Sequence, residues 1–184
     1  EKVYKMMLDY DERMGRKNDF AQNYKSFVEN NLRENTLVSS WNATENESFA
    51  MWKMYAKEKL GIAIKTSIEG LQNCFSKTER NIYIGEVNYY NDDAPKYETG
   101  NMYYSLMVKH HYYEFESEVR CITSLNKEKE HTHRIEVDLN DLIKEIYISP
   151  FASKTGLISI IEFLKKKYGL NFKINISGVN DTWI

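Results

Sequence analysis

Two carboxylates and an arginine recur at every second position in the stretch 113–122, where Glu116, Glu118 and Arg120 alternate with apolar residues. A period of two is that of a β-strand, so we expect the three charged side chains to share one face of a strand. The apolar residues between them, such as Val119, should occupy the opposite face. A charged row of this kind either rests against complementary charges or lines a polar cleft, and the sequence leaves both alternatives open.

Two carboxylates beside an arginine could stabilise a transition state that develops positive charge, such as the oxocarbenium-like state formed when a bond to ribose breaks. Glu118 is the candidate for the carboxylate that stabilises this state through a ribose hydroxyl, and Glu116 for the acid that orients or deprotonates the acceptor. Arg120 could orient the substrate or hold a pyrophosphate through its fork of donors. The alternative is a structural ladder of cross-strand charges, which contributes about 0.2–1 kcal/mol per pair.

Three aromatic residues are candidates for a ligand-binding wall. Trp52 and Tyr55 lie three positions apart on a predicted helix, so they share a face that either packs into the core or stacks on a nicotinamide or base. Trp41 stands at the end of a predicted strand, from which its ring could reach a cleft.

Lys109 is the remaining ligand-binding candidate, and we expect it on a helix that precedes the acidic strand. It either pairs with Glu114 or Glu116 or contacts a phosphate. An exposed ion pair of this kind contributes little to stability.

The histidines do not predict a metal site. His131 and His133 would share one strand face, and His110 has helical spacing to Glu114. Protein metal sites need three or four converging ligands, and no further motif completes either pair. We therefore expect no bound metal.

Composition limits the classes of protein to which the chain can belong. Its 184 residues, 42% of them apolar, can bury one good core, so we expect a single domain over residues 1–184. The 25 basic and 27 acidic residues argue against nucleic acid or an anionic membrane as an electrostatic partner. Two cysteines and the lack of a spanning or signal segment predict a cytoplasmic protein. Because the chain begins with Glu1, we expect that preceding residues are missing.

Apolar spacing predicts an α+β fold, with a helical N-terminal third and a mixed or mainly antiparallel sheet flanked by helices. Thr44 and Glu47 form a predicted capping box that opens the helix carrying Trp52, and Gly169 should end the last helix. Predicted helices cover residues 3–14, 20–28, 50–56, 68–75, 102–112 and 157–164, and predicted strands cover residues 37–41, 62–64, 82–90, 116–123, 134–137, 145–149 and 172–176.

Several blocks of residues occur in an order that resembles a known family. They are Val38-Ser39-Ser40-Trp41, Ser48 to Tyr55, Gly61 to Ser67, Lys109, Glu116-x-Glu118-x-Arg120 and Ile143 to Pro150. This order, over residues 37–177, resembles the uncharacterised bacterial and phage family known as domain of unknown function 2971. Members often carry Cys at Ser39 or Ser40 and Trp at Tyr113. The family layout is similar to the ADP-ribosyltransferase fold, which is an analogy of fold alone.

The leading hypothesis is an enzyme that takes NAD as a substrate, rather than as a cofactor, and transfers or hydrolyses its ADP-ribose. A small nucleotide is then the expected partner. The second hypothesis is a non-enzymatic module of a bacterial or phage defence or toxin system, which binds a protein through exposed aromatic residues. A weaker third hypothesis is a hydrolase that uses two carboxylates.

Overall fold

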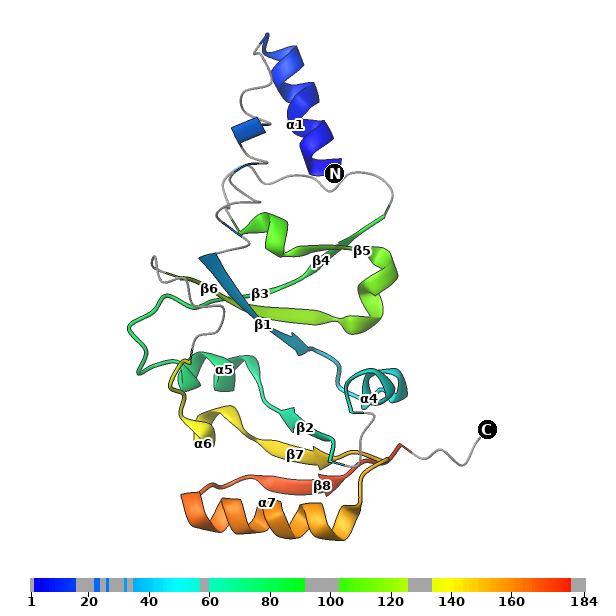
Figure 1. Ribbon diagram of the computed structural model, residues 1–184, viewed down its shortest axis with the longest axis vertical. Helices are drawn as coiled ribbons and strands as arrows, with labels where there is room; N and C mark the ends of the chain where they lie inside the picture. Colours follow the sequence, from blue (N-terminus) through cyan, green and yellow to red (C-terminus); the bar gives the residue numbers. More distant parts are fainter. Residues whose placement is uncertain are drawn as a thin grey trace. The chain divides into compact units, whose positions relative to one another are not determined.

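The computed structural model describes residues 2–15, 22–23, 26, 32, 35–56, 60–91, 103–125 and 134–179 (Figure 1). The chain divides into two compact units. The first comprises Glu1–Ala43 and Arg80–Arg134, and the second comprises Thr44–Glu79 and Ile135–Ile184. The expectation of a single domain stays a prediction.

The first unit is built on a three-stranded antiparallel sheet. Its central strand, β6 (Glu118–Ser124), pairs with β1 (Thr36–Asn42) on one side and with β3 (Tyr83–Glu86) on the other. Because β6 is central, Val119, Cys121 and Ile122 are almost fully buried. The other described elements of this unit are helix α1 (Lys2–Arg13), the parallel strands β4 (Asn88–Tyr90) and β5 (Val108–His110), and the 3₁₀ helices η2 (Tyr104–Leu106) and η3 (His111–Glu116).

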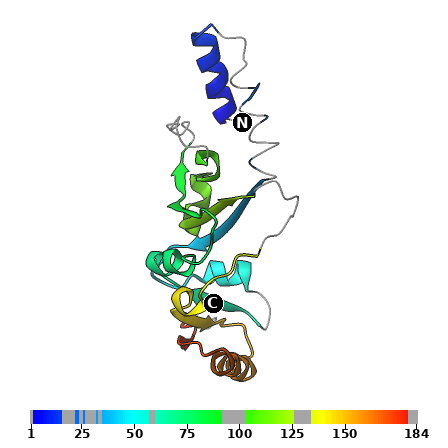
Figure 2. The ribbon, with the colours of Figure 1, turned by 90° about the vertical axis from the view of Figure 1, so that its left-hand side faces the viewer.

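The second unit contains a mixed three-stranded sheet. Its central strand, β7 (Glu145–Ile148), is antiparallel to β2 (Ile62–Lys65) and parallel to β8 (Lys173–Ile176). Helix α7 (Lys154–Tyr168) connects β7 to β8, as a parallel crossover requires, and it runs alongside these strands in Figures 1 and 2. The short helices of this unit are α4 (Phe49–Tyr55), α5 (Ile68–Cys74) and α6 (Leu139–Leu142).

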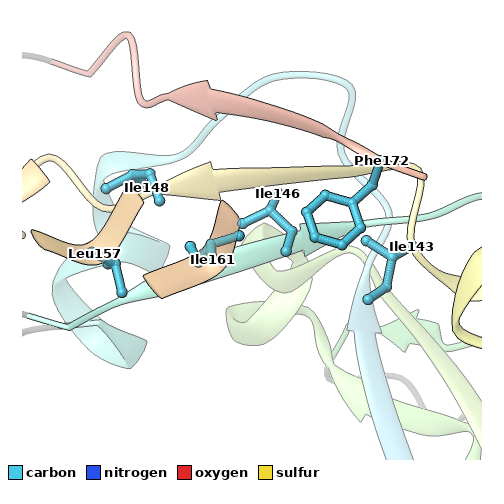
Figure 3. Close-up of a cluster of buried hydrophobic side chains, with 6 residues drawn as sticks. All are labelled: Ile143, Ile146, Ile148, Leu157, Ile161 and Phe172. Atoms are coloured by element: carbon cyan, nitrogen blue, oxygen red, sulfur yellow. The ribbon is translucent and has the colours of Figure 1, made fainter. Parts of the chain in front are cut away.

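The core of the second unit lies between β7 and α7. Ile146 and Ile148 alternate with polar residues along β7, so both point to one face, where they meet Leu157 and Ile161 of α7 (Figure 3). Helix α7 ends at Gly169, whose φ of 61° is left-handed. This confirms the predicted C-terminus of the helix, since glycine adopts that conformation at little cost.

The structure confirms an α+β fold with antiparallel and mixed sheets, but the prediction of a helical N-terminal third was wrong. Strand β1 begins at Thr36, well inside that third. The predicted helix over residues 20–28 lies largely outside the described residues. The predicted strand 82–90 is interrupted at Val87, where β3 ends and β4 has not begun.

Two further predicted elements were wrong for physical reasons. Residues 103–112 form η2, β5 and part of η3 instead of one helix, because Val108–His110 within this aromatic-rich stretch pair with β4. Residues 134–137 alternate like a strand, but they have no strand partner among the described residues. The expected capping box is also absent, because Ser48 caps α4 and accepts a hydrogen bond from the Met51 N–H.

Candidate functional site

The register of the first sheet determines which side chains surround Glu118 and Arg120. In the β1–β6 pair, Ser40 lies opposite Arg120 and Asn42 lies opposite Glu118. Residues opposite each other in an antiparallel pair project to the same face. Glu118, Arg120, Ser40 and Asn42 therefore gather on one face of the sheet. On the other side of β6, Gly85 of β3 lies opposite Arg120, and the Met107 side chain packs against this glycine, since an added Cβ would lie 2.8 Å from Met107 Cε.

Glu116 does not belong to β6, which corrects the prediction that both acids lie on one strand. It is the last residue of η3, and Ser117 follows it in a left-handed conformation, with φ 39° and ψ 60°. The Ser117 N–H donates to the Glu114 carbonyl at 3.0 Å, while the Asn42 amide donates to the Glu116 carbonyl at 2.5 Å. The left-handed residue thus turns the chain abruptly between the two glutamates.

Lys109 brings the two carboxylates together despite this turn. It lies on β5 rather than on the predicted helix, and its Nζ is 2.5 Å from Glu116 Oε2 and 3.1 Å from Glu118 Oε2. The side chains of Lys109, Glu116 and Glu118 are 25%, 13% and 7% exposed. A partly buried lysine between two carboxylates is a charge-assisted bridge.

Arg120 completes the charged cluster. Its Nη2 donates to Glu118 Oε2 at 2.8 Å, and its Nη1 donates to the carbonyl oxygen of Leu106 in η2. Glu118 Oε2 therefore accepts from two cations. The cluster of Lys109, Glu116, Glu118 and Arg120 contains two positive and two negative charges, so its charges balance.

Glu118 is held in its ionised form. Burial is the largest single influence and acts to raise its pKa, but hydrogen bonds from Arg120, Ser40 and Lys109 act together in the opposite direction and lower the pKa below its usual value. Burial likewise acts to lower the pKa of Lys109, while its bonds to Glu116 and Glu118 outweigh that effect and raise it. Both groups are charged at neutral pH.

Two tyrosines that sequence reasoning did not select border the cluster. The Glu118 backbone N–H donates to the Tyr89 hydroxyl oxygen at 2.9 Å. The Lys109 Nζ lies 5.2 Å from the ring centroid of Tyr113, and that tyrosine is half exposed. Tyr113 is thus an aromatic residue beside the carboxylates, and the family resemblance was the one sequence signal that pointed to it.

Of the three residues of the predicted aromatic wall, Trp41 alone belongs to the same unit as these acids. Trp41 lies opposite Val119 in the register, so it projects to the other face of the sheet from Glu118 and Arg120. Trp52 and Tyr55 belong to the second unit. Trp52 is 6% exposed and its indole N–H donates to Glu47 Oε2 at 3.0 Å, whereas Tyr55 is exposed. Trp52 is therefore a buried residue of α4 and is not available to stack on a ligand.

Within the described part of the chain, no group of three or more potential ligands could hold a metal ion. His110 and Glu114 lie on β5 and η3 and do not share a helix, and the His110 ring instead stacks on Tyr112 with centroids 4.2 Å apart. His131 and His133 lie outside the described residues.

As for membranes, none of the described helices combines the length and apolar character needed to cross one.

No protein-family model, curated protein or solved structure matches this chain.

Proposed function

We propose that the chain handles an NAD-like dinucleotide and transfers or hydrolyses its ADP-ribose, with Glu118 as the essential carboxylate. The observation that carries this proposal is that Glu118 is 7% exposed and yet ionised, with its orientation fixed by Arg120, Ser40 and Lys109. A fixed anion in a site of low exposure is what stabilises positive charge that develops on a substrate.

The proposed reaction begins when the bond between the ribose C1′ and the nicotinamide nitrogen breaks. The electron pair leaves with nicotinamide, and the ribose becomes oxocarbenium-like. A carboxylate has about four acceptor positions, so the three side-chain donors to Glu118 leave room for a ribose hydroxyl. The oxygen of water or of an acceptor then attacks C1′, and its proton passes to Glu116.

The cations and Tyr113 suit the rest of such a substrate. Lys109 and Arg120 lie beside the carboxylates and match the charge of a pyrophosphate. The half-exposed ring of Tyr113 offers a stacking surface next to Lys109. In this proposal the pyrophosphate draws Lys109 away from Glu116, which frees Glu116 to accept the proton.

The test compares Glu118→Gln with the natural chain by nicotinamide release from NAD. Loss of one preorganised electrostatic group lowers turnover by roughly 10²–10³-fold. Glu86→Gln is the matched control, since Glu86 is exposed and pairs with Val119 on the opposite face. Thermal unfolding checks that both variants fold. Full turnover by folded Glu118→Gln would rule out the assignment, and so would the absence of turnover in the natural chain.

A second candidate function is a protein-interaction module, and one observation favours it. Lys109 and Arg120 are both engaged by carboxylates of the same chain, as expected of a structural charge cluster. Next to them, η3 exposes three aromatic side chains: Tyr112 at 70%, Tyr113 at 50% and Phe115 at 50%. Under this alternative, Tyr112→Ser and Phe115→Ser abolish partner binding, whereas Glu118→Gln affects stability alone.

A further inference from the structure

Helix α7 has a second apolar face that does not serve the core of its unit. Leu157 and Ile161 are buried against the sheet, whereas Ile160, Phe163 and Leu164 are 53%, 64% and 40% exposed. The spacing of these three residues, i, i+3 and i+4, puts them on one side of the helix. We call Ile160, Phe163 and Leu164 the outer stripe of α7.

The outer stripe ends in positive charge. Lys167 continues its spacing at i+7, and Lys166 is also exposed. Lys165 is turned away, since its Nζ lies 5.5 Å from the ring centroid of Phe172 in the core. The single acid of α7, Glu162, lies about 160° around the helix from Ile160, at 100° per residue. Glu162 lies four residues before Lys166 and so neighbours that lysine. Helix α7 nevertheless has four lysines against this one acid, so the stripe combines exposed apolar side chains with a net positive charge on its own helix.

A second copy of this helix would be a poor partner for the stripe. In an antiparallel pair, Lys166 and Lys167 would approach the partner's first helical turn, which contains Lys154 and no acid. That end of a helix also carries the positive end of the helix dipole. In a parallel pair, the lysines would face each other. Both arrangements bring like charges together, which is destabilising.

An anionic membrane also fits less well than an acidic peptide. The outer stripe covers little more than one helical turn, roughly 6 Å of helix. Two exposed lysines contribute about 1 kcal/mol each at an anionic membrane surface. An amphipathic helix of a partner protein makes better use of such a stripe, because it can pack apolar side chains on Phe163 and put carboxylates beside the lysines.

We propose that the outer stripe of α7 docks an amphipathic, acidic helical segment of a partner protein. The apolar face of that segment contacts Ile160, Phe163 and Leu164, and its carboxylates pair with Lys166 and Lys167. This surface belongs to the second unit and is independent of the charged cluster around Glu118. Its affinity falls as salt is added, because exposed charge pairs are screened.

The experiment uses the full chain and a fluorescent model helix with a leucine stripe flanked by glutamates. A matched peptide with lysines in place of the glutamates is the control. Fluorescence anisotropy should give at least tenfold tighter binding for the acidic peptide, equivalent to about 1.4 kcal/mol. Phe163→Ser and the double variant Lys166→Glu/Lys167→Glu should each weaken it at least tenfold, whereas Met54→Ser, at an exposed position of α4, should not.

Three results would overturn the proposal. One is that the acidic peptide binds no more tightly than the basic peptide, including the case in which it does not bind at millimolar concentration. The second is binding to phosphatidylserine-containing vesicles, lost in Phe163→Ser, without binding of the peptide. The third is self-association of the natural chain in sedimentation experiments that Phe163→Ser abolishes. Because Phe163 is 64% exposed, this substitution leaves the core intact, and circular dichroism verifies that the variants fold.

Discussion

Lys109 Nζ lies 2.5 Å from Glu116 Oε2, and this ion pair joins strand β5 to the end of helix η3. Only seven positions separate the two residues. The same nitrogen reaches Glu118 at the start of β6. One lysine thus connects three successive elements of the first unit. These ion pairs hold the chain on both sides of the left-handed Ser117. They also hold the carboxylates of the candidate site in place.

Replacing Lys109 by Met should destabilise the fold, because it leaves Glu116 and Glu118 with little exposure and without their shared cation. Removing one partner of a buried pair costs about 3–5 kcal/mol, and the partial exposure of Lys109 reduces this to about 2 kcal/mol. Urea unfolding measures the change. Lys77→Met is the control and should have little effect, because the Lys77–Asp138 pair is exposed. Equal effects of the two substitutions would contradict a structural role for the bridge.

The stability supplied by Glu118 should depend on pH in a defined direction. Its pKa is lower in the folded chain than its ordinary value of 4.5. Its contribution is therefore fully present above pH 4.5 and is lost as the pH falls through the lower, folded-state pKa. Unfolding free energies of the natural chain and Glu118→Gln should differ most near neutral pH and converge in acid. A constant difference across this range would show that Glu118 does not act through its charge.

The elements that the sequence predicted well are those that local pattern determines. β7, α7 and β8 follow from alternating or helically spaced isoleucines and leucines, and Gly169 marks a helix end. The turn at Ser117 had no such signal, because the left-handed conformation is usually marked by glycine or asparagine. The prediction therefore began the strand two residues too early, at Glu116 instead of Glu118.

The candidate site was less predictable, because its contacts join distant parts of the chain. Pairing of Lys109 with Glu116 was among the sequence alternatives. Ser40, by contrast, reaches Glu118 only because β1 and β6 pair in one particular register. A shift of that register by one residue would bring Trp41 to the face of Glu118 and remove Ser40. That pairing joins segments far apart in the chain, so the local pattern of one strand does not reveal its partner.

Ser117 provides a test of the backbone turn between the two glutamates. A left-handed conformation costs an ordinary L-residue roughly 1–2 kcal/mol and costs glycine almost nothing. Ser117→Gly should therefore preserve or raise stability, whereas the β-branched Ser117→Val should lower it by about 1–2 kcal/mol. Thermal unfolding of the two variants measures the difference. If Val were tolerated as well as Gly, the turn would not have the observed φ of 39° in solution.

Two glycines of the second unit should respond oppositely to the same substitution. A Cβ added to Gly61 would lie 2.6 Å from the Ala56 Cβ and 3.0 Å from the Ser149 Cβ, so Gly61→Ala should cost about 1–3 kcal/mol through overpacking. At Gly156, within α7, an added Cβ meets nothing within 4 Å, and alanine is the better helix former by about 0.5–1 kcal/mol. Chemical denaturation should therefore give a lower midpoint for Gly61→Ala and a higher one for Gly156→Ala. Equal shifts in one direction would mean that the close packing of Gly61 against Ala56 and Ser149 does not hold in solution.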